Sequence, residues 1–235
     1  MALSIQNNQY NNNYMKINQN RQHDNMQKLA SGKRINAAKD DVAGAAISEK
    51  MLKKINEENA KIEGYQNRQS MINIADGMNQ GVSDYLMDMY EQGVRSGNSL
   101  LSGDDRAAIR SYQESLKEGA QSLISNTKYN EMRVASENAQ ASVPQNFDLD
   151  SINESMESLN EIRSKEGAES NALDHAINSS KEAAINTTAA MSRIADTEYG
   201  GAVSDLRTNQ AIGAYQTSLQ NMNMQNAAAL MSNLV

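Results

Sequence analysis

The chain is organised around LASGKRINAAKDDVAGAAISEKM, residues 29–51, which separates two long helical patterns. Ser31 and Gly32 predict the end of the first helix, because glycine takes up a left-handed conformation without the steric cost of a Cβ atom. Asp40 or Asp41 then offers a carboxylate to the open N–H groups at the start of a second helix. The stretch therefore predicts a hinge between two helices.

The composition favours long helices that bury narrow seams. One proline among 235 residues leaves almost nothing to interrupt a helix. Only 4% of the residues are aromatic, and aromatic side chains supply much of the buried area in thick globular cores. The many asparagines, glycines and serines are poor helix formers, so we expect the helices to be stabilised by packing within the chain or against other chains.

Residues 41–96 form the longest helical pattern. Apolar positions at alternating steps of four and three predict a coiled-coil seam along it, namely Met71, Ala75, Met78, Val82, Tyr85 and Met89. Residues 105–125 are expected to fold back as an antiparallel helix after an acidic start signal at residues 102–105, with one face formed by Ile109, Tyr112, Leu116, Ala120 and Leu123. The sequence NTKYNEMRV, residues 126–134, predicts a small extended or hairpin segment.

The second half of the chain repeats the helical pattern. Steps of four and three from Ile152 to Ile194 pass through apolar residues and through several small or polar ones. Gly200 and Gly201 predict a bend, and a last helix resumes at Val203. Its apolar end, residues 227–235, is expected to pack against the protein's own helices or against a thin apolar stripe in the first helix. The predicted fold class is therefore all-α, an elongated antiparallel bundle or coiled coil of long helices.

The patterns divide the chain into five segments. The first expected segment is an N-terminal helix with its linker (residues 1–40), and the last is a C-terminal helix that pairs with it (residues 200–235). Between them we expect the first half of an outer helical rod (41–135), a turnaround linker (136–150) and the second half of the rod (151–199). We expect residues 1–30 to be loose in the isolated monomer, because their apolar stripe is too thin to hold a helix alone.

Two stretches resemble the terminal signatures of bacterial flagellins. The first is SGKRINAAKDDVAGAAI, residues 31–47, and the second is SRIAD, residues 192–196, followed by Tyr199, Val203, Ser204 and Gln210. Spaced matches within residues 163–177 stand between them in the order that a flagellin would have. The resemblance covers nearly the whole chain, although residues 136–150 stand where most flagellins carry large variable outer domains.

The resemblance implies a structural subunit that self-assembles into the bacterial flagellar filament, with its two ends paired to form an inner tube. The residues expected to pack in that inner core are Ile5, Tyr10, Tyr14, Ile17, Leu29, Leu219, Met222, Leu230 and Leu234. It also implies secretion through the flagellum's own type III channel, which agrees with the absence of a signal-peptide pattern at the start of the sequence. Implied partners are further copies of the chain, an export chaperone, and the filament cap and junction proteins.

Charged residues within both signatures form a second group of candidates. We expect Arg34, Asp40, Asp41, Arg193 and Asp196 to tie the linker between the inner and outer helices to the same chain or to a neighbouring copy. The alternative is that they are solvated helix ends, where surface ion pairs contribute little.

The resemblance further implies a face that an animal innate immune receptor reads, aligned here with residues 86–91. Leu86 and Glu91 fit the family's pattern, but Asp88 stands where an arginine is expected. Since reversing a charge at a contact can cost several kcal/mol, we expect weak or absent receptor activation.

The sequence offers no catalytic or cofactor motif. His23 and His175 are preceded three residues earlier by Asn20 and Ala172, so neither completes the Glu-x-x-His pair of a di-metal bundle. A net charge of −7 without a basic block argues against nucleic-acid binding, and no apolar segment is long enough for membrane insertion. Besides a flagellin, three alternatives remain: a hook–filament junction protein of the same superfamily, an intracellular coiled-coil adaptor that binds through the apolar tail and, most distantly, an enzymatic helical bundle.

Overall fold

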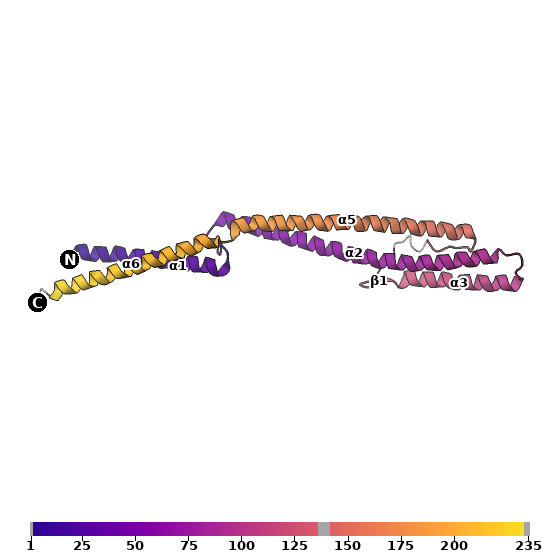
Figure 1. Cartoon of the computed structure of the whole chain (residues 1–235), viewed down its shortest axis with the longest axis horizontal. Coiled ribbons are helices and arrows are strands. Elements are labelled where there is room, and N and C mark those ends of the chain that lie inside the picture. Colours follow the sequence, from indigo (N-terminus) through magenta and orange to yellow (C-terminus); the bar gives the residue numbers. More distant parts are fainter. Residues whose placement is uncertain (1, 136–141, 233–235) are drawn as a thin grey trace. The chain divides into compact units, whose positions relative to one another are not determined.

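The computed structural model describes residues 2–135 and 142–232 of the chain (Figure 1). The helices and strands in this part are α1 (Ala2–Ser31), α2 (Val42–Ser96), α3 (Gly103–Asn126), β1 (Lys128–Tyr129), β2 (Met132–Arg133), α5 (Leu149–Ala195) and α6 (Tyr199–Ser232). The predicted all-α fold class is confirmed. Contacts divide the chain into a central unit, residues 57–183, and a terminal unit, residues 1–56 with 184–235.

The central unit is built from α2, α3 and α5, with α2 between the other two helices (Figure 1). One core cluster joins all three helices and the segment before α5, and it consists of Met78, Val82, Leu86, Met89, Leu116, Ala120, Ile124, Val143, Ile152, Leu159 and Ile162. Most of the seam predicted on α2 is buried, including Ala75, Met78, Val82 and Met89. The alternating four and three spacing therefore located the core face of α2 correctly.

The start of α3 follows from its sequence, and its predicted face is correct at Leu116 and Ala120, which are buried. The Ser102 hydroxyl accepts a hydrogen bond from the Asp105 N–H, and the Asp105 carboxylate accepts one from the Ser102 N–H, each at 3.1 Å, which makes a capping box. The prediction for Tyr112 was wrong, because this side chain is half exposed while Gln113 is buried. Gln113 takes the inward position because its amide donates to the Met89 carbonyl of α2 at 3.0 Å.

The predicted hairpin is confirmed. Strands β1 and β2 pair antiparallel, with Lys128 opposite Arg133 and Tyr129 opposite Met132. Asn130 and Glu131 form the two-residue turn with φ angles of 49° and 65°. Positive φ at both turn residues suits the twist of a short antiparallel ribbon.

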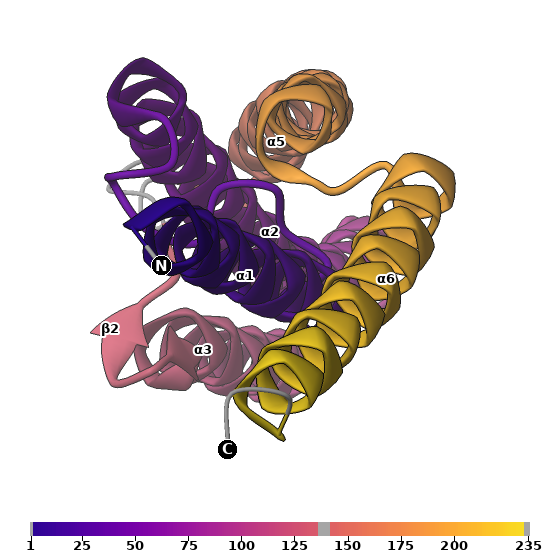
Figure 2. The same cartoon turned by 90° about the vertical axis from the view of Figure 1, so that its left-hand side faces the viewer.

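In the terminal unit, α1 and α6 pack side by side and run antiparallel, so that the start of α1 and the end of α6 lie on the same side (Figure 2). Gly32 ends α1 with a φ of 69°, and the Asp41 carboxylate caps α2 by accepting from the Gly44 N–H at 2.8 Å. The predicted stop and start signals are both confirmed.

The break before α6 lies a few residues earlier than the sequence predicted. α5 ends at Ala195, and Gly200 and Gly201 belong to the first turn of α6, so the expectation of a bend at these glycines was wrong. Their N–H groups donate to the Glu198 carboxylate at 3.1 and 2.6 Å. Glu198 therefore starts the helix, and glycine backbone freedom is not needed there.

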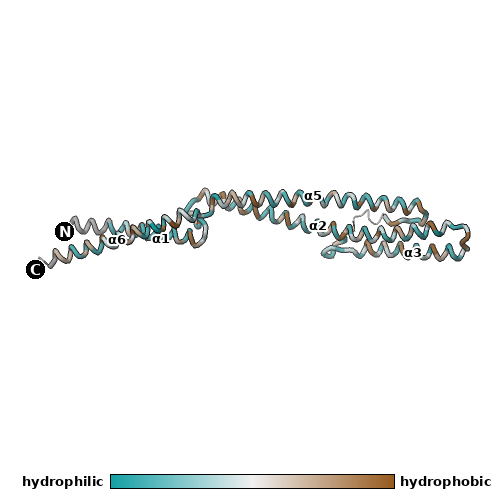
Figure 3. The backbone as a smooth tube through the Cα atoms, in the orientation of Figure 1, coloured by the Kyte–Doolittle hydropathy of each residue, from teal (hydrophilic) through white to brown (hydrophobic). Residues whose placement is uncertain are grey.

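The hydropathy of the helices alternates over short distances (Figure 3). Within the described residues, no helix is both long enough and apolar enough to cross a membrane.

Candidate functional site: the paired terminal helices

The linker after α1 is joined to the end of α5 within the terminal unit. The Arg34 N–H donates to the Ala195 carbonyl at 2.7 Å, and the Arg34 guanidinium donates to the Ile194 carbonyl at 2.6 Å. An antiparallel bridge pairs Lys33 with Asp196, whose carboxylate accepts a hydrogen bond from the Ser192 hydroxyl. The structure thus places Arg34 and Asp196 at one junction between two chain segments that are far apart in sequence.

The other charged candidates take different places. The Asp40 carboxylate accepts from the N–H groups of Ala37 and Asn36 at 2.9 and 3.0 Å, and these hydrogen bonds lower the pKa of Asp40. Asp41 caps α2, as described above, and Arg193 is exposed on the surface. Asp40 and Asp41 therefore hold the linker to itself and to α2, whereas the junction with α5 is made by Arg34 and Asp196.

The contact between α1 and α6 is made largely by amide side chains. The side chains of Asn18 and Gln22 both donate to the Asn209 carbonyl at 2.8 Å. Towards the free ends of the helices, the Gln220 amide donates to the Asn12 side-chain oxygen at 3.3 Å. Asn18 is buried at 6% exposure, so this pairing depends on hydrogen bonds more than on apolar contact.

Most of the apolar residues expected in the inner core lie away from this contact. Tyr14, Ile17 and Met222 are 61%, 47% and 52% exposed, while Leu29 and Leu219 are half-buried. The side chains of Ile5, Tyr10, Leu230 and Leu234 lie outside the described residues. Within the single chain, Tyr14 and Ile17 lie beside the contact with α6 and not in it, so their packing in an inner core of stacked copies stays a prediction.

A signal for this contact was present in the sequence. On α1 the half-buried and buried residues recur at alternating steps of four and three, as Asn11, Met15, Asn18, Gln22, Asn25 and Leu29. On α6 the same steps connect half-buried residues, as Ala202, Leu206, Asn209, Gly213, Gln216 and Gln220. Both sets follow a coiled-coil heptad, but a search for apolar residues passes over them because most are amides.

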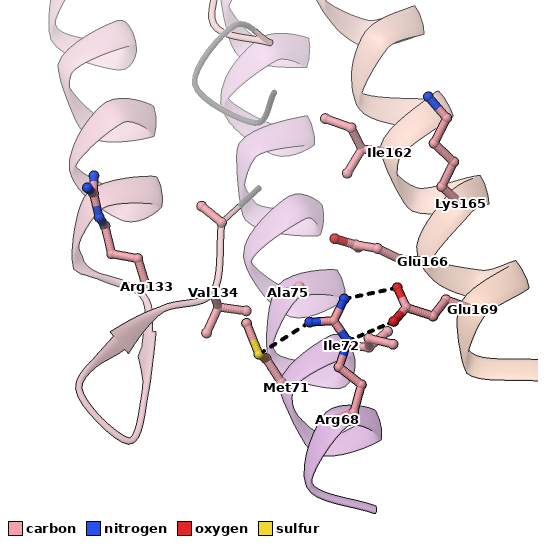
Figure 4. Close-up of a pocket in the computed structure, with 11 residues that line it drawn as sticks. Arg68, Met71, Ile72, Ala75, Arg133, Val134, Ile162, Lys165, Glu166 and Glu169 are labelled. Carbon is pink, nitrogen blue, oxygen red and sulfur yellow. Dashed lines mark hydrogen bonds and ion pairs between the residues drawn. The ribbon is translucent and has the colours of Figure 1, made fainter. Parts of the chain in front are cut away.

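The central unit contains a pocket of about 310 Å³ between α2, α5 and the segment that follows β2 (Figure 4). Its apolar lining includes Ile72, Val134 and Ile162, and on one side Arg68 pairs with both carboxylate oxygens of Glu169 at 2.7 and 3.1 Å. This pair raises the pKa of Arg68 and lowers that of Glu169. The pocket lining therefore contains the bidentate ion pair of Arg68 and Glu169 beside apolar side chains.

Glu166 lines the same pocket and is bonded to a buried amide. The Asn79 side-chain nitrogen donates to Glu166 Oε2 at 2.8 Å, while the other Asn79 side-chain atom, Oδ1, is buried and accepts no hydrogen bond from the described residues. Burial raises the pKa of Glu166. Across the described part of the chain, no group of three or more His, Cys, Asp or Glu side chains is placed to hold a metal ion.

The segment aligned with the receptor-binding face is only partly on the surface. Leu86 is fully buried in the core of the central unit, so its assignment to an exposed face was wrong. Asp88 and Glu91 are exposed, and Glu91 pairs with Arg95 one turn later at 2.6 Å. The heptad spacing that buries Val82 and Met89 also turns Leu86 inward.

The protein consists of long packed helices with a narrow core, and many apolar side chains are exposed on their surfaces. These features are typical of a structural protein that acts through contacts with other protein molecules. A sequence profile of the bacterial flagellin N-terminal helical region matches residues 4–140. A flagellin of Halalkalibacterium halodurans is 30% identical over 253 aligned residues, which cover 92% of this chain and 93% of that protein. The chain belongs to the bacterial flagellin family, whose members are structural subunits of the extracellular flagellar filament.

Two proteins of Treponema maltophilum add to this comparison. The flagellar filament 31.3 kDa core protein is 26% identical over 275 residues, covering 94% of this chain and 96% of that protein. The flagellar filament 30.7 kDa core protein is 34% identical over 125 residues, covering 53% of this chain and 44% of that protein.

Proposed function

We propose that this flagellin polymerises through its terminal unit, in which α1 and α6 form the inner tube of the filament. The observation that carries the proposal is the exposure of apolar side chains on these two helices. Ile212, Tyr215 and Met222 of α6 are 42%, 66% and 52% exposed, and they recur at helical spacing on one face, as Tyr14 and Ile17 do on α1. Soluble proteins rarely leave such stripes uncovered, and further copies of the chain would cover them.

The position of the exposed apolar stripes on α1 and α6 favours contacts between copies that form an open polymer. The exposed stripes lie on the outer sides of α1 and α6, while the amide contact between the two helices is already made within the chain. Contacts between unlike surfaces of identical subunits extend into a helical filament when the rotation between subunits does not close a ring.

We propose the same packing in the inner core of the filament for the other candidates that the sequence analysis named, which are Ile5, Tyr10, Leu29, Leu219, Leu230 and Leu234. The linker residues Arg34 and Asp196 would hold the terminal pair at a fixed place on the chain, through the hydrogen bonds and bridge between the linker and α5. The helix breaks at residues 32–41 and 196–198 support segment boundaries near residues 40 and 199, whereas the contacts divide the two units within α2 and α5, after residues 56 and 183. The turnaround assigned to residues 136–150 lies partly outside the described residues.

The family also supports an export route and partners. Export through the flagellum's own type III channel, with a chaperone, and assembly beneath a cap and above junction proteins would follow the family's pattern. A chain without cysteine suits passage in an unfolded state, because it cannot mispair disulfides on the way.

A truncation and a matched substitution test the proposal. Deleting residues 219–235 is expected to leave a helical protein that forms no filaments, as judged by negative-stain electron microscopy of heat-depolymerised protein after seeding. Replacing Tyr215 and Met222 by serine in the full chain should raise the critical concentration for assembly by roughly tenfold or more, because each buried apolar side chain contributes about 1.5–3 kcal/mol. Tyr112→Ser is the control, since Tyr112 is 50% exposed on α3 of the central unit. Long filaments of uniform width from the truncated protein would refute the proposal.

A further inference from the structure

The seam between α1 and α6 combines heptad spacing with amide side chains. Positions that are normally apolar in a coiled coil are occupied by Asn18 and Gln22 on α1 and by Asn209 and Gln216 on α6. The Gln216 side-chain oxygen is buried and accepts no hydrogen bond from the described residues. Such a seam gives up stability, because a buried amide contributes less than a leucine and costs free energy when it is unpaired.

The hydrogen bonds in this seam converge on one point. Asn18 and Gln22 lie one turn apart on α1, yet both donate to the single carbonyl of Asn209 at 2.8 Å. A slide of one heptad would bring the carbonyl of Ala202 or Gln216 to the same place, because every helical residue presents an equivalent carbonyl. The hydrogen bonds alone therefore do not select an alignment, and the residue one turn after the carbonyl decides whether the two amides can reach it.

Gly213 makes room for this arrangement. A Cβ atom at Gly213 would lie 3.1 Å from the side-chain nitrogens of both Asn18 and Gln22. The residues seven positions before and after it in the seam are Leu206 and Gln220, so a slide of one heptad would bring a large side chain to the same place. The space opposite the two amides thus exists at one register.

We propose that Asn18, Gln22 and Gly213 form a register lock that fixes a single alignment of α1 against α6. Buried polar groups specify register because every misaligned state leaves them unpaired, even where an apolar seam would bind more tightly. The inference deepens the proposed function and rests on it for its purpose, since one alignment gives every copy the same outward-facing apolar stripes.

Disulfide mapping in the full-length monomeric chain tests the lock, and the absence of cysteine makes the chain suitable for it. The pair Asn12→Cys with Gln220→Cys reports the observed register, because these side chains already touch at 3.3 Å. The pair Asn12→Cys with Ala227→Cys reports a slide of one heptad. The measurement is the rate of intrachain disulfide formation in a glutathione buffer, with products separated from dimers on a non-reducing gel and confirmed by mass spectrometry.

The expected result compares two backgrounds. With Asn18 and Gln22 intact, the in-register pair should oxidise roughly tenfold faster or more, since the slide leaves the two amides without an acceptor. With Asn18→Leu and Gln22→Leu together, the two rates should come within about threefold of each other, because leucines pack equally well in several registers. Asn13→Leu with Asn20→Leu, on the exposed side of α1, is the control and should keep the original ratio.

Two results would overturn the lock. One is an unchanged ratio in the double leucine variant. The other is loss of both cross-links in that variant with helix content retained, since the amides would then hold the helices together without choosing their alignment. As a second test, Gly213→Ala should slow the in-register cross-link several-fold, and an unaltered rate would also count against the lock. All these rates are measured on monomers, so a failure to form filaments would refute the proposed function and leave the register result standing. Absence of both cross-links with Asn18 and Gln22 intact, which is the result expected if residues 1–30 are loose in the monomer, would also overturn the lock.

Discussion

Replacing Glu166 by glutamine should stabilise the central unit at neutral pH. In the folded chain the Glu166 carboxylate accepts one hydrogen bond from Asn79, and the buried Asn79 Oδ1 is left without a donor. Glutamine has nearly the same shape, but it can accept from the Asn79 amide with its oxygen and donate to Oδ1 with its nitrogen. The substitution therefore completes a buried pair that the carboxylate leaves half made.

The magnitude follows from that one added hydrogen bond. Pairing a buried acceptor is worth about 1 kcal/mol, which corresponds to a rise in Tm of about 4 °C for a unit of this size. The substitution also gives up an attraction to Arg68, but this loss is small because Arg68 is already bonded to both oxygens of Glu169. The net effect at neutral pH is stabilising.

The gain depends on pH in a defined direction. Burial raises the pKa of Glu166 above 4.5, Asp76 and Glu169 add to the rise, and the Asn79 hydrogen bond and Arg68 oppose it. Because its pKa is raised, Glu166 binds its proton more tightly in the folded state than in the unfolded state. The stability that Glu166 contributes is therefore complete below the unfolded-state pKa. It is lost as the pH rises through the folded-state pKa. Glutamine does not titrate, so its advantage should appear over that window and persist at higher pH.

Thermal unfolding followed by circular dichroism at about pH 7 and about pH 3.5 would measure this. The wild-type chain, Glu166→Gln and the control Glu157→Gln, which lies at an exposed position of α5, should be compared at both pH values. Glu166→Gln should unfold at a higher temperature at pH 7 only, and the control should follow the wild type. A variant that is less stable than wild type at pH 7, or a shift of equal size at both pH values, would refute the reasoning.

Three further predictions concern the helix ends and the surface. Gly44→Ala should destabilise the linker by about 1–3 kcal/mol, because a Cβ atom there would lie 2.4 Å from the Asp41 carboxylate and 2.7 Å from Ile35. Gly64→Ala, with open space around it, should instead stabilise α2 by about 0.5–1 kcal/mol. Chemical denaturation measures both changes in stability, and equal effects would contradict the explanation. Ser102→Ala should cost about 1 kcal/mol through loss of the α3 capping box, seen as faster amide hydrogen exchange in the first turn, and unchanged exchange would count against it. Purified protein should activate an innate immune receptor weakly in reporter cells because Asp88 replaces the expected arginine, and a potent response would overturn that expectation.

The helix ends and the central core could be predicted from the sequence because their signals are local. Gly32, Asp41 and the capping box at Ser102 each act on the backbone within a few residues of their own position. The apolar heptad on α2 likewise located its buried face. These features required no knowledge of the packing partner.

The candidate site was harder to predict, because its buried residues are polar. Whether an amide such as Gln113 or Asn18 faces inward depends on a carbonyl that only the folded partner helix supplies. A search for apolar spacing therefore found Leu116 and Ala120 on α3 but selected Tyr112 in place of Gln113. On α1 it selected Tyr14 and Ile17, which are exposed, and passed over the amide heptad.

The amide seam between α1 and α6 has a consequence for calorimetry. Burial of apolar surface gives unfolding its positive heat-capacity change, whereas exposure of polar surface reduces it. Separation of α1 from α6, through Asn18, Gln22 and Asn209, should therefore have a small heat-capacity change and a shallow dependence on temperature. The central unit, with its cluster of leucine, isoleucine and methionine side chains, should absorb heat in a sharper and more strongly curved transition. Calorimetry would thus distinguish the unfolding of the two units by their heat-capacity changes, because one contact is polar and the other apolar.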